Sequence, residues 1–191
     1  MSINRTLIVH GFGAGIDDHW FRWLANETHG DRLALPDARR PDADTWTSLV
    51  ADALANSDEG TAVVAHSLGC VTVARALQQV SDVRLGAFVA VAPFRRPLSG
   101  PFGDTELDCF IADGLDAFLA GTEVAAVRRR ITRATVFASD DDPIVPSEAS
   151  DEFAADLDVA VRVVPGAGHF LADDGVSTLP QILDGLDLRG L

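Results

Sequence analysis

The sequence predicts an α/β fold with a doubly wound, mostly parallel sheet of about six strands. Short runs of β-branched and apolar residues alternate with segments of helical periodicity, which is the pattern of βαβ units. The runs are apolar throughout, as expected of strands that are covered on both faces. At 191 residues, with no repeat or linker, the chain fits a single domain over residues 1–191. In such sheets, ligands bind beyond the carboxyl ends of the strands.

The first half of the chain is expected to supply strands over residues 6–10, 32–36 and 61–66. Asp17 or Asp18 is suited to cap the helix after the first strand, because a short acidic side chain accepts hydrogen bonds from the free N–H groups there. The apolar face of that helix is expected to carry Trp20, Trp23 and Leu24. A helix over residues 42–56 is expected to turn Trp46, Leu49, Val50 and Leu54 inward, and another helix runs through residues 71–77.

The second half is expected to supply strands over residues 85–92, 132–138 and 159–164. Residues 93–121 lack clean periodicity and hold several prolines and glycines, so we expect a loop with one short helix there. Further helices are expected over residues 123–130, 147–157 and 178–188.

The charge of the chain argues against two classes of partner. The formal net charge is −14, and such a surface repels phosphate backbones and anionic lipid headgroups. We therefore expect no nucleic acid and no membrane as partners. All fifteen basic residues are arginine, which indicates either salt adaptation or a genomic coding bias. The two explanations remain open, as does the oligomeric state.

The absence of lysine from the sequence excludes several enzyme classes. Without lysine there is no phosphate-binding loop ending in Lys-Ser or Lys-Thr, no Schiff base with pyridoxal phosphate, and no Ser-x-x-Lys acylation site. Cys70 and Cys109 form neither a C-x-x-C motif nor a disulfide framework, so both are expected to be reduced. No signal peptide or apolar membrane span is recognised, and a cytoplasmic location is the expectation.

The central motif is the stretch Ala65-His66-Ser67-Leu68-Gly69, between a predicted strand and a predicted helix. In the G-x-S-x-G nucleophile elbow, a sharp turn presents the serine, and its neighbours must be small because strand and helix pass close together. Here Ala65 replaces the first glycine, which adds only a methyl group. The stretch therefore makes Ser67 a candidate nucleophile, although serines are also common in turns and helix caps.

Two further residues supply the partners that a serine nucleophile needs. His169 follows the last predicted strand within a glycine-rich loop and is the candidate base. Asp142 follows the fifth strand and is the candidate that orients the histidine, with Asp141 as the alternative. The order Ser, Asp, His along the chain is that of the α/β-hydrolase fold. The backbone N–H groups of Phe12 and Leu68 are the candidate oxyanion hole.

Alternative sites in the same regions fit less well. Gly11, Gly13 and Gly15 follow the first strand, but a dinucleotide-binding G-x-G-x-x-G motif would need glycine at Ile16. The histidines and aspartates show no spacing typical of metal ligands. No cofactor and no metal are therefore expected.

The motifs together resemble the small bacterial YdeN-like serine hydrolases, which are related to the retinoblastoma-binding serine hydrolases of animals. The resemblance lies in residues 10–12, 18–24, 65–69, 91–98, 141–146 and 168–170. It implies a minimal α/β-hydrolase fold without a large cap domain, a Ser67, Asp142 and His169 triad, and esterase-like hydrolysis. Leu107-x-Cys109-x-Ile111 lacks the glutamate of the L-x-C-x-E motif, so a retinoblastoma-type partner is not inferred.

The sequence thus predicts a serine hydrolase that cleaves small acyl esters, with thioesters or amides as the alternative substrates, through an acyl-Ser67 intermediate. Its substrate pocket is expected to involve Trp20, Phe94 and Arg95, with Arg96 nearby. A catalytically silent binding protein on the same fold and a lyase using the same triad are the alternatives.

Overall fold

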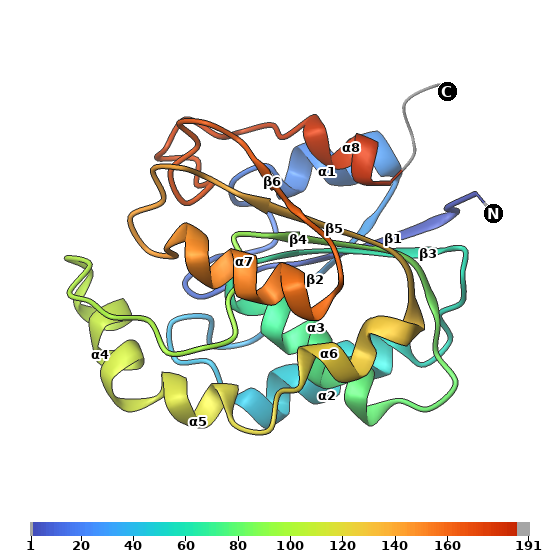
Figure 1. Cartoon of the computed structure of the whole chain (residues 1–191), viewed down its shortest axis with the longest axis horizontal. Coiled ribbons are helices and arrows are strands. Elements are labelled where there is room, and N and C mark those ends of the chain that lie inside the picture. The colour runs from blue at the N-terminus through green and yellow to red at the C-terminus, as the bar shows by residue number, and fades with distance from the viewer. Residues whose placement is uncertain (1, 187–191) are drawn as a thin grey trace.

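The computed structural model describes residues 2–186 and contains one six-stranded sheet (Figure 1). Its strands lie in the order β2-β1-β3-β4-β5-β6, and every neighbouring pair is parallel. The strands are β1 (Arg5–Val9), β2 (Asp31–Leu33), β3 (Thr61–His66), β4 (Leu85–Val91), β5 (Ile131–Ala138) and β6 (Val161–Val163). The predicted α/β fold is therefore confirmed.

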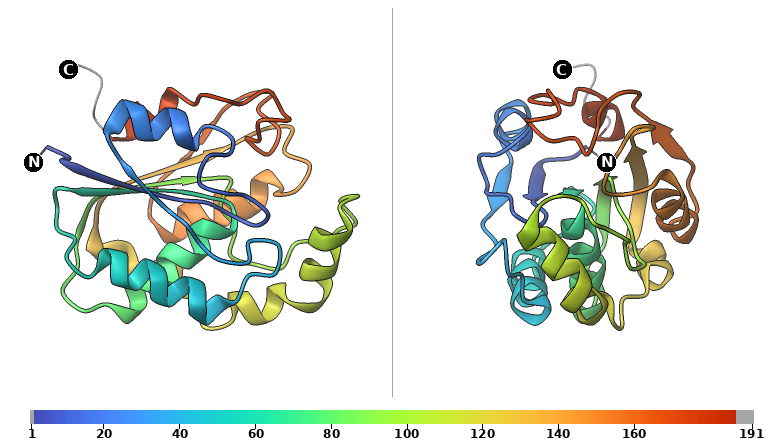
Figure 2. Two further views of the ribbon diagram at one scale, coloured as in Figure 1. Left: turned by 180° about the vertical axis from the view of Figure 1, so that it is seen from behind. Right: turned by 90° about the vertical axis from the view of Figure 1, so that its left-hand side faces the viewer.

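Helices cover both faces of the sheet. The helices are α1 (Phe21–Thr28), α2 (Ala43–Leu54), α3 (Leu68–Gln79), α4 (Thr105–Asp113), α5 (Leu115–Leu119), α6 (Val124–Val127), the 3₁₀ helix η1 (Arg128–Arg130), α7 (Ser147–Asp156) and α8 (Gln181–Gly185). Helices α1 and α8 lie on one face, and α2, α3, α6 and α7 lie on the other (Figures 1 and 2). None of the described helices is long and apolar enough to cross a membrane.

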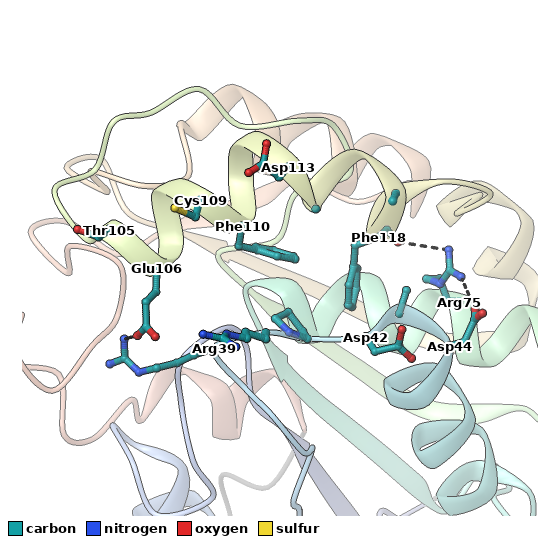
Figure 3. A pocket seen from close by; sticks show the side chains of 15 residues that line it. Arg39, Asp42, Asp44, Arg75, Thr105, Glu106, Cys109, Phe110, Asp113 and Phe118 are labelled. Atoms are coloured by element: carbon teal, nitrogen blue, oxygen red, sulfur yellow. Dashed lines mark hydrogen bonds and ion pairs between the residues drawn. The ribbon is translucent and has the colours of Figure 1, made fainter.

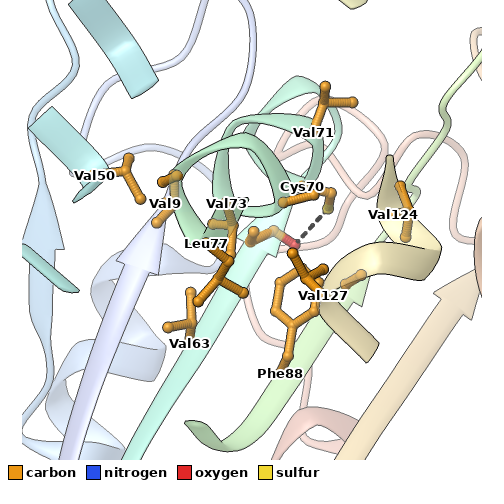
Figure 4. Packing of buried hydrophobic residues seen from close by; sticks show 14 of the residues in the cluster. Val9, Val50, Val63, Cys70, Val71, Val73, Leu77, Phe88, Val124 and Val127 are labelled. Atoms are coloured by element: carbon orange, nitrogen blue, oxygen red, sulfur yellow. Dashed lines mark hydrogen bonds between the residues drawn. The ribbon is translucent and has the colours of Figure 1, made fainter. Parts of the chain in front are cut away.

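The double cover explains why the central strands are apolar throughout. In β3, Val63 and Ala65 belong to the core beneath α2 and α3, whereas Ala62 and Val64 belong to the core beneath α1 and α8. Successive side chains of a strand point to opposite faces, so both sets must be apolar. Figure 4 shows α3 packed on the sheet. There the buried Cys70 is a small packing residue, and its thiol contacts the carbonyl of Ala65 at 3.3 Å.

Several predicted elements differ from the observed ones. Leu49 was expected to point inward, but it is 42% exposed because α2 packs through the opposite side of the helix. Asp18 does not cap α1, because the N-cap of this helix is Trp20. The Asp18 carboxylate instead accepts a hydrogen bond from the Gly15 N–H. The terminal helix, predicted over residues 178–188, is observed as the shorter α8. Residues 187 and 188 of that prediction lie outside the described residues.

The largest difference from the predicted secondary structure is in the segment between β4 and β5. Instead of a loop with one short helix, it forms α4 and α5 before α6 and η1. No residue of α4 is fully buried, and its apolar side chains, Leu107, Phe110 and Ile111, line a cavity instead of packing into the centre of the core. Among residues 2–186, the segment between β4 and β5 holds only short helices and no large cap domain.

Candidate active site

Ser67 lies in the turn between β3 and α3, at the carboxyl end of the sheet. Its φ of 51° and ψ of −124° are rarely adopted by residues other than glycine, and such strain is typical of functional sites. The turn is held on both sides, since the Ser67 N–H donates to the Val91 carbonyl at 2.9 Å and the Cys70 N–H donates to the Ser67 carbonyl at 2.9 Å. The side chain is thereby fixed above the strand ends.

Two glycines make this turn possible. A Cβ at Gly69 would lie 2.5 Å from the His10 carbonyl oxygen, so α3 can approach β1 only without a side chain there. A Cβ at Gly11 would lie 2.9 Å from the His66 carbonyl oxygen and 3.0 Å from the Ser67 Cβ. Ala65, the departure from the G-x-S-x-G pattern, fits because its methyl group packs fully buried in the core.

Ser67, His169 and Asp142 form a continuous hydrogen-bonded chain. The His169 Nδ1 lies 2.8 Å from the Asp142 Oδ2, and its Nε2 lies 3.1 Å from the Ser67 Oγ. An ionised carboxylate only accepts, so the imidazole carries its proton on Nδ1 and its Nε2 lone pair faces the serine hydroxyl. The side chains of His169 and Asp142 are 6% and 2% exposed. In this arrangement, Nε2 is placed to take the hydroxyl proton.

The structure distinguishes the two candidate aspartates. Asp142 turns one oxygen to His169, while its other oxygen accepts the N–H groups of Ile144 and Val145 at 2.8 and 2.9 Å. Asp141 instead accepts the Ser139 hydroxyl at 2.6 Å and the Gly168 N–H at 2.8 Å, and these bonds lower the pKa of its carboxyl group. Asp141 therefore shapes the histidine loop without contacting the imidazole.

Two residues that sequence reasoning missed support the His169 loop. The Asp174 carboxylate accepts the N–H groups of His169 and Leu171, at 2.8 and 3.0 Å. His66 donates its Nε2–H to the His169 carbonyl at 2.9 Å. Burial, with a smaller influence from the neighbouring His169, holds the pKa of His66 well below its usual value.

A cavity of about 370 Å³ opens in front of Ser67 and His169. Its wall is largely apolar, and much of it comes from the chain between β4 and α5, with Phe94, Leu98, Phe102, Leu107, Phe110 and Ile111. Phe12 and Leu68 also line it. The Leu68 N–H is at the start of α3, where backbone N–H groups have no acceptor within the helix. A Cβ at Gly11 would lie 3.4 Å from this nitrogen, so the two loops with the predicted oxyanion donors are adjacent.

Two of the three predicted pocket residues do not line the cavity. Trp20 is fully buried in the core beneath α1, so its indole packs away from Ser67. Arg95 turns to α7, where it forms an ion pair with Asp156 at 2.8 Å. Arg96 likewise pairs with Glu152 at 2.7 Å. Only Phe94 is in the wall, as predicted.

A second hollow, of about 710 Å³, lies between α2 and the α4–α5 pair (Figure 3). It contains none of Ser67, Asp142 and His169, but Arg39 and Phe110 line both spaces. Arg39 pairs with Glu106 at 2.6 Å, and the Phe110 ring stacks on Phe12 with centroids 5.2 Å apart. Arg39 and Phe110 therefore lie between the larger hollow and the cavity in front of Ser67 and His169, which we call the reactive cavity.

Comparison with known proteins shows which family and fold the chain shares. Residues 6–188 match the family described as serine hydrolase. YdeN of Bacillus subtilis is 31% identical over 187 residues, which span 94% of this chain and 93% of that protein. The crystal structure of the ydeN gene product superposes with a TM-score of 0.83, covering 96% of both chains.

More distant structures share the fold. A YdeN-like protein from Pectobacterium atrosepticum has a TM-score of 0.68 at 19% identity, covering 96% of this chain and 91% of that one. A lipase-esterase related protein from Clostridium acetobutylicum has a TM-score of 0.62 at 15% identity, covering 96% and 95%. The extent of the family match and the similarity to YdeN confirm the resemblance seen in the sequence: this chain belongs to the serine hydrolase family.

Proposed function

We propose that this protein is a carboxylesterase that hydrolyses small acyl esters through an acyl-Ser67 intermediate. The observation that carries the proposal is the hydrogen-bonded chain from Asp142 through His169 to Ser67, at the wall of an apolar cavity. A serine hydroxyl is a weak nucleophile until a base removes its proton, and the imidazole of His169 lies at the distance that this transfer needs.

In the first half of the reaction, the Ser67 Oγ attacks the ester carbonyl carbon while its proton passes to the His169 Nε2. Asp142 stabilises the resulting imidazolium through Nδ1. The carbonyl oxygen becomes an oxyanion, which accepts the backbone N–H groups of Phe12 and Leu68. The carbon–oxygen bond to the alcohol then breaks, and His169 returns the proton to the departing alcohol oxygen.

In the second half, a water molecule attacks the acyl carbon and gives its proton to the His169 Nε2. The same N–H groups hold the second oxyanion. The bond from the acyl carbon to the Ser67 Oγ then breaks, and His169 returns the proton to the serine. The products are a carboxylic acid and the free enzyme.

The cavity supports a neutral ester with a short acyl chain as the substrate. Its wall is mainly apolar, and its volume of about 370 Å³ suits a small molecule. The net charge of −14 disfavours nucleic acid and anionic membranes as partners. A cytoplasmic location is part of the proposal and is supported by two unpaired thiols, of which Cys109 is exposed.

The direct test measures hydrolysis of p-nitrophenyl esters of graded acyl length, together with labelling by a fluorophosphonate probe. The Ser67→Ala variant is expected to lose about 10⁴-fold or more in kcat and all labelling. Ser147→Ala is the matched control, because Ser147 is exposed at the start of α7, and it should behave as the wild type. Absence of labelling in the folded wild type would indicate a silent binding protein. An adduct that survives Ser67→Ala would reject the acyl-enzyme.

A further inference from the structure

His19 lines the reactive cavity, yet none of the steps above uses it. It lies just before α1 with a φ of 53°, a left-handed conformation that is uncommon for residues other than glycine. Its ring packs edge-to-face on Phe21, with centroids 5.3 Å apart. The side chain is therefore held in place beside the cavity.

A backbone hydrogen bond fixes which nitrogen of His19 carries the proton. The Ala172 N–H donates to the His19 Nδ1 at 3.0 Å, so Nδ1 must present a lone pair. In the neutral imidazole, the proton is then on Nε2. Burial is the largest influence on this group and lowers the pKa of His19, although the nearby Asp18 carboxylate opposes it. The Nε2–H has no acceptor among residues 2–186 and remains available to a ligand.

His19 lies at the His169 end of the cavity. Its ring centroid is 5.9 Å from that of His66, which is in turn 4.9 Å from that of His169. Its partner Ala172 belongs to the same loop as His169. Helix α4, which supplies part of the apolar wall, lies on the other side of the strand ends from the loops before α8; the right-hand view of Figure 2 shows α4 in yellow-green and these loops in red.

The proposed reaction orients the ester between these two ends. His169 must deliver a proton to the departing alcohol oxygen, so the alcohol part lies toward His169, and the acyl chain takes the apolar end beside α4. The alcohol part therefore lies next to the His19 Nε2–H. Asp173 lines the same end with a carboxylate, which disfavours an anionic alcohol part.

We propose that His19 binds the alcohol part of the substrate by donating its Nε2–H to a neutral oxygen there. This inference rests on the proposed esterase function and names its substrate class: esters of an apolar acyl group with an alcohol that carries a second, uncharged oxygen, as an ether or hydroxyl group. A purely hydrocarbon alcohol leaves the His19 N–H without a partner in the complex, which costs affinity.

The test compares two esters of the same size, 2-methoxyethyl butyrate and n-butyl butyrate. They differ only in that one methylene group of the butyl chain is replaced by an ether oxygen. With each rate divided by that of hydroxide-catalysed hydrolysis, the wild type should prefer the methoxyethyl ester in kcat/KM by about fivefold. His19→Phe should remove that preference by lowering kcat/KM for the methoxyethyl ester alone, and the n-butyl ester should change less than twofold. His19→Asn, which keeps an N–H donor and tolerates the left-handed backbone, should restore part of the preference.

Different outcomes overturn the two proposals. Equal corrected rates for the two esters in the wild type, or an equal loss for both in His19→Phe, would reject the role of His19 while leaving the esterase intact. The wild-type comparison stands even if the Phe variant does not fold. Hydrolysis that persists in Ser67→Ala would instead reject the esterase mechanism itself.

Discussion

His66 directly precedes Ser67 and joins two distant parts of the site. Its Nε2–H donates to the carbonyl of His169, which is 103 positions later in the chain. The His66 Nδ1 is buried and has no hydrogen-bond partner within the described residues. A charged imidazolium here would be buried beside His169, so the ring is neutral and positions the His169 backbone.

Acidification should therefore destabilise the protein through His66. Burial holds the pKa of His66 well below the ordinary value of 6.5, so below about pH 6.5 the unfolded chain binds a proton that the folded chain does not. Stability is then lost as the pH falls, by at most about 1.4 kcal/mol per pH unit for one such group. His66→Gln keeps a donor for the His169 carbonyl but removes the titration.

Urea unfolding at pH 7.5, 6.5 and 5.5 in 0.5 M NaCl measures this effect. The wild type should lose free energy of unfolding toward pH 5.5, and the His66→Gln variant should lose less over the same range. A residual slope is expected in the variant, because burial also lowers the pKa of His10 and of His19. Parallel pH profiles for the two proteins would contradict this account of His66.

The residues of the site were predictable from the sequence where their position directly after a strand determines their place in the fold. Ser67, Asp142 and His169 each follow a strand, and the parallel sheet brings those strand ends together. Trp20 was placed wrongly in the pocket because its indole is fully buried in the core beneath α1, and Arg95 because its partner is far away in the chain. The acidic partner of Arg95 is Asp156, and nothing in the local sequence indicates that pair.

At the scale of elements, the central strands were predictable because both of their faces are buried. Helix α4 was not, because it has no buried residue and turns its apolar side chains to the cavity and to α5. Phe110 is the main contact of this helix: it stacks on Phe12 and meets Phe118 edge-to-face, with ring centroids 6.1 Å apart. Phe110 therefore ties an exposed helix to the rest of the apolar wall at the acyl end of the cavity.

Phe110→Ala should extend the range of acyl chains that the enzyme accepts. Loss of the ring joins the reactive cavity to the neighbouring hollow of about 710 Å³, and each methylene group newly buried there contributes about 0.8 kcal/mol. The ratio of kcat/KM for p-nitrophenyl octanoate to that for the butyrate should rise about tenfold, which corresponds to burial of about two of the four additional methylene groups. The half-buried ring should cost about 1 to 2 kcal/mol of stability when removed.

Glu106→Gln is the control for this change. Glu106 is on the same helix but contacts Arg39 rather than the Phe12 ring, so its loss leaves the aromatic wall in place. Its chain-length profile should match that of the wild type. If Phe110→Ala also keeps the wild-type profile, Phe110 does not limit the acyl end.

At the scale of the whole molecule, the balance of charge is the main unexplained feature. Acidic residues exceed basic ones by fourteen, and the described ion pairs are largely at the surface. The Arg84–Glu59 pair, for example, joins side chains that are 58% and 35% exposed. Exposed pairs of this kind add little stability, so they do not offset the repulsion among the remaining carboxylates.

The folded state should therefore gain stability from salt. The Debye length falls from about 10 Å at 0.1 M to about 3 Å at 1 M, which screens repulsion between exposed carboxylates, and Tm should rise over this range of NaCl. The double variant Asp52→Asn and Asp151→Asn removes two exposed charges without breaking a described ion pair. It should raise Tm at low salt and make Tm depend less steeply on the NaCl concentration. A wild-type Tm that stays constant from 0.05 to 1 M NaCl would exclude salt adaptation and favour coding bias as the origin of the lysine-free, acidic composition.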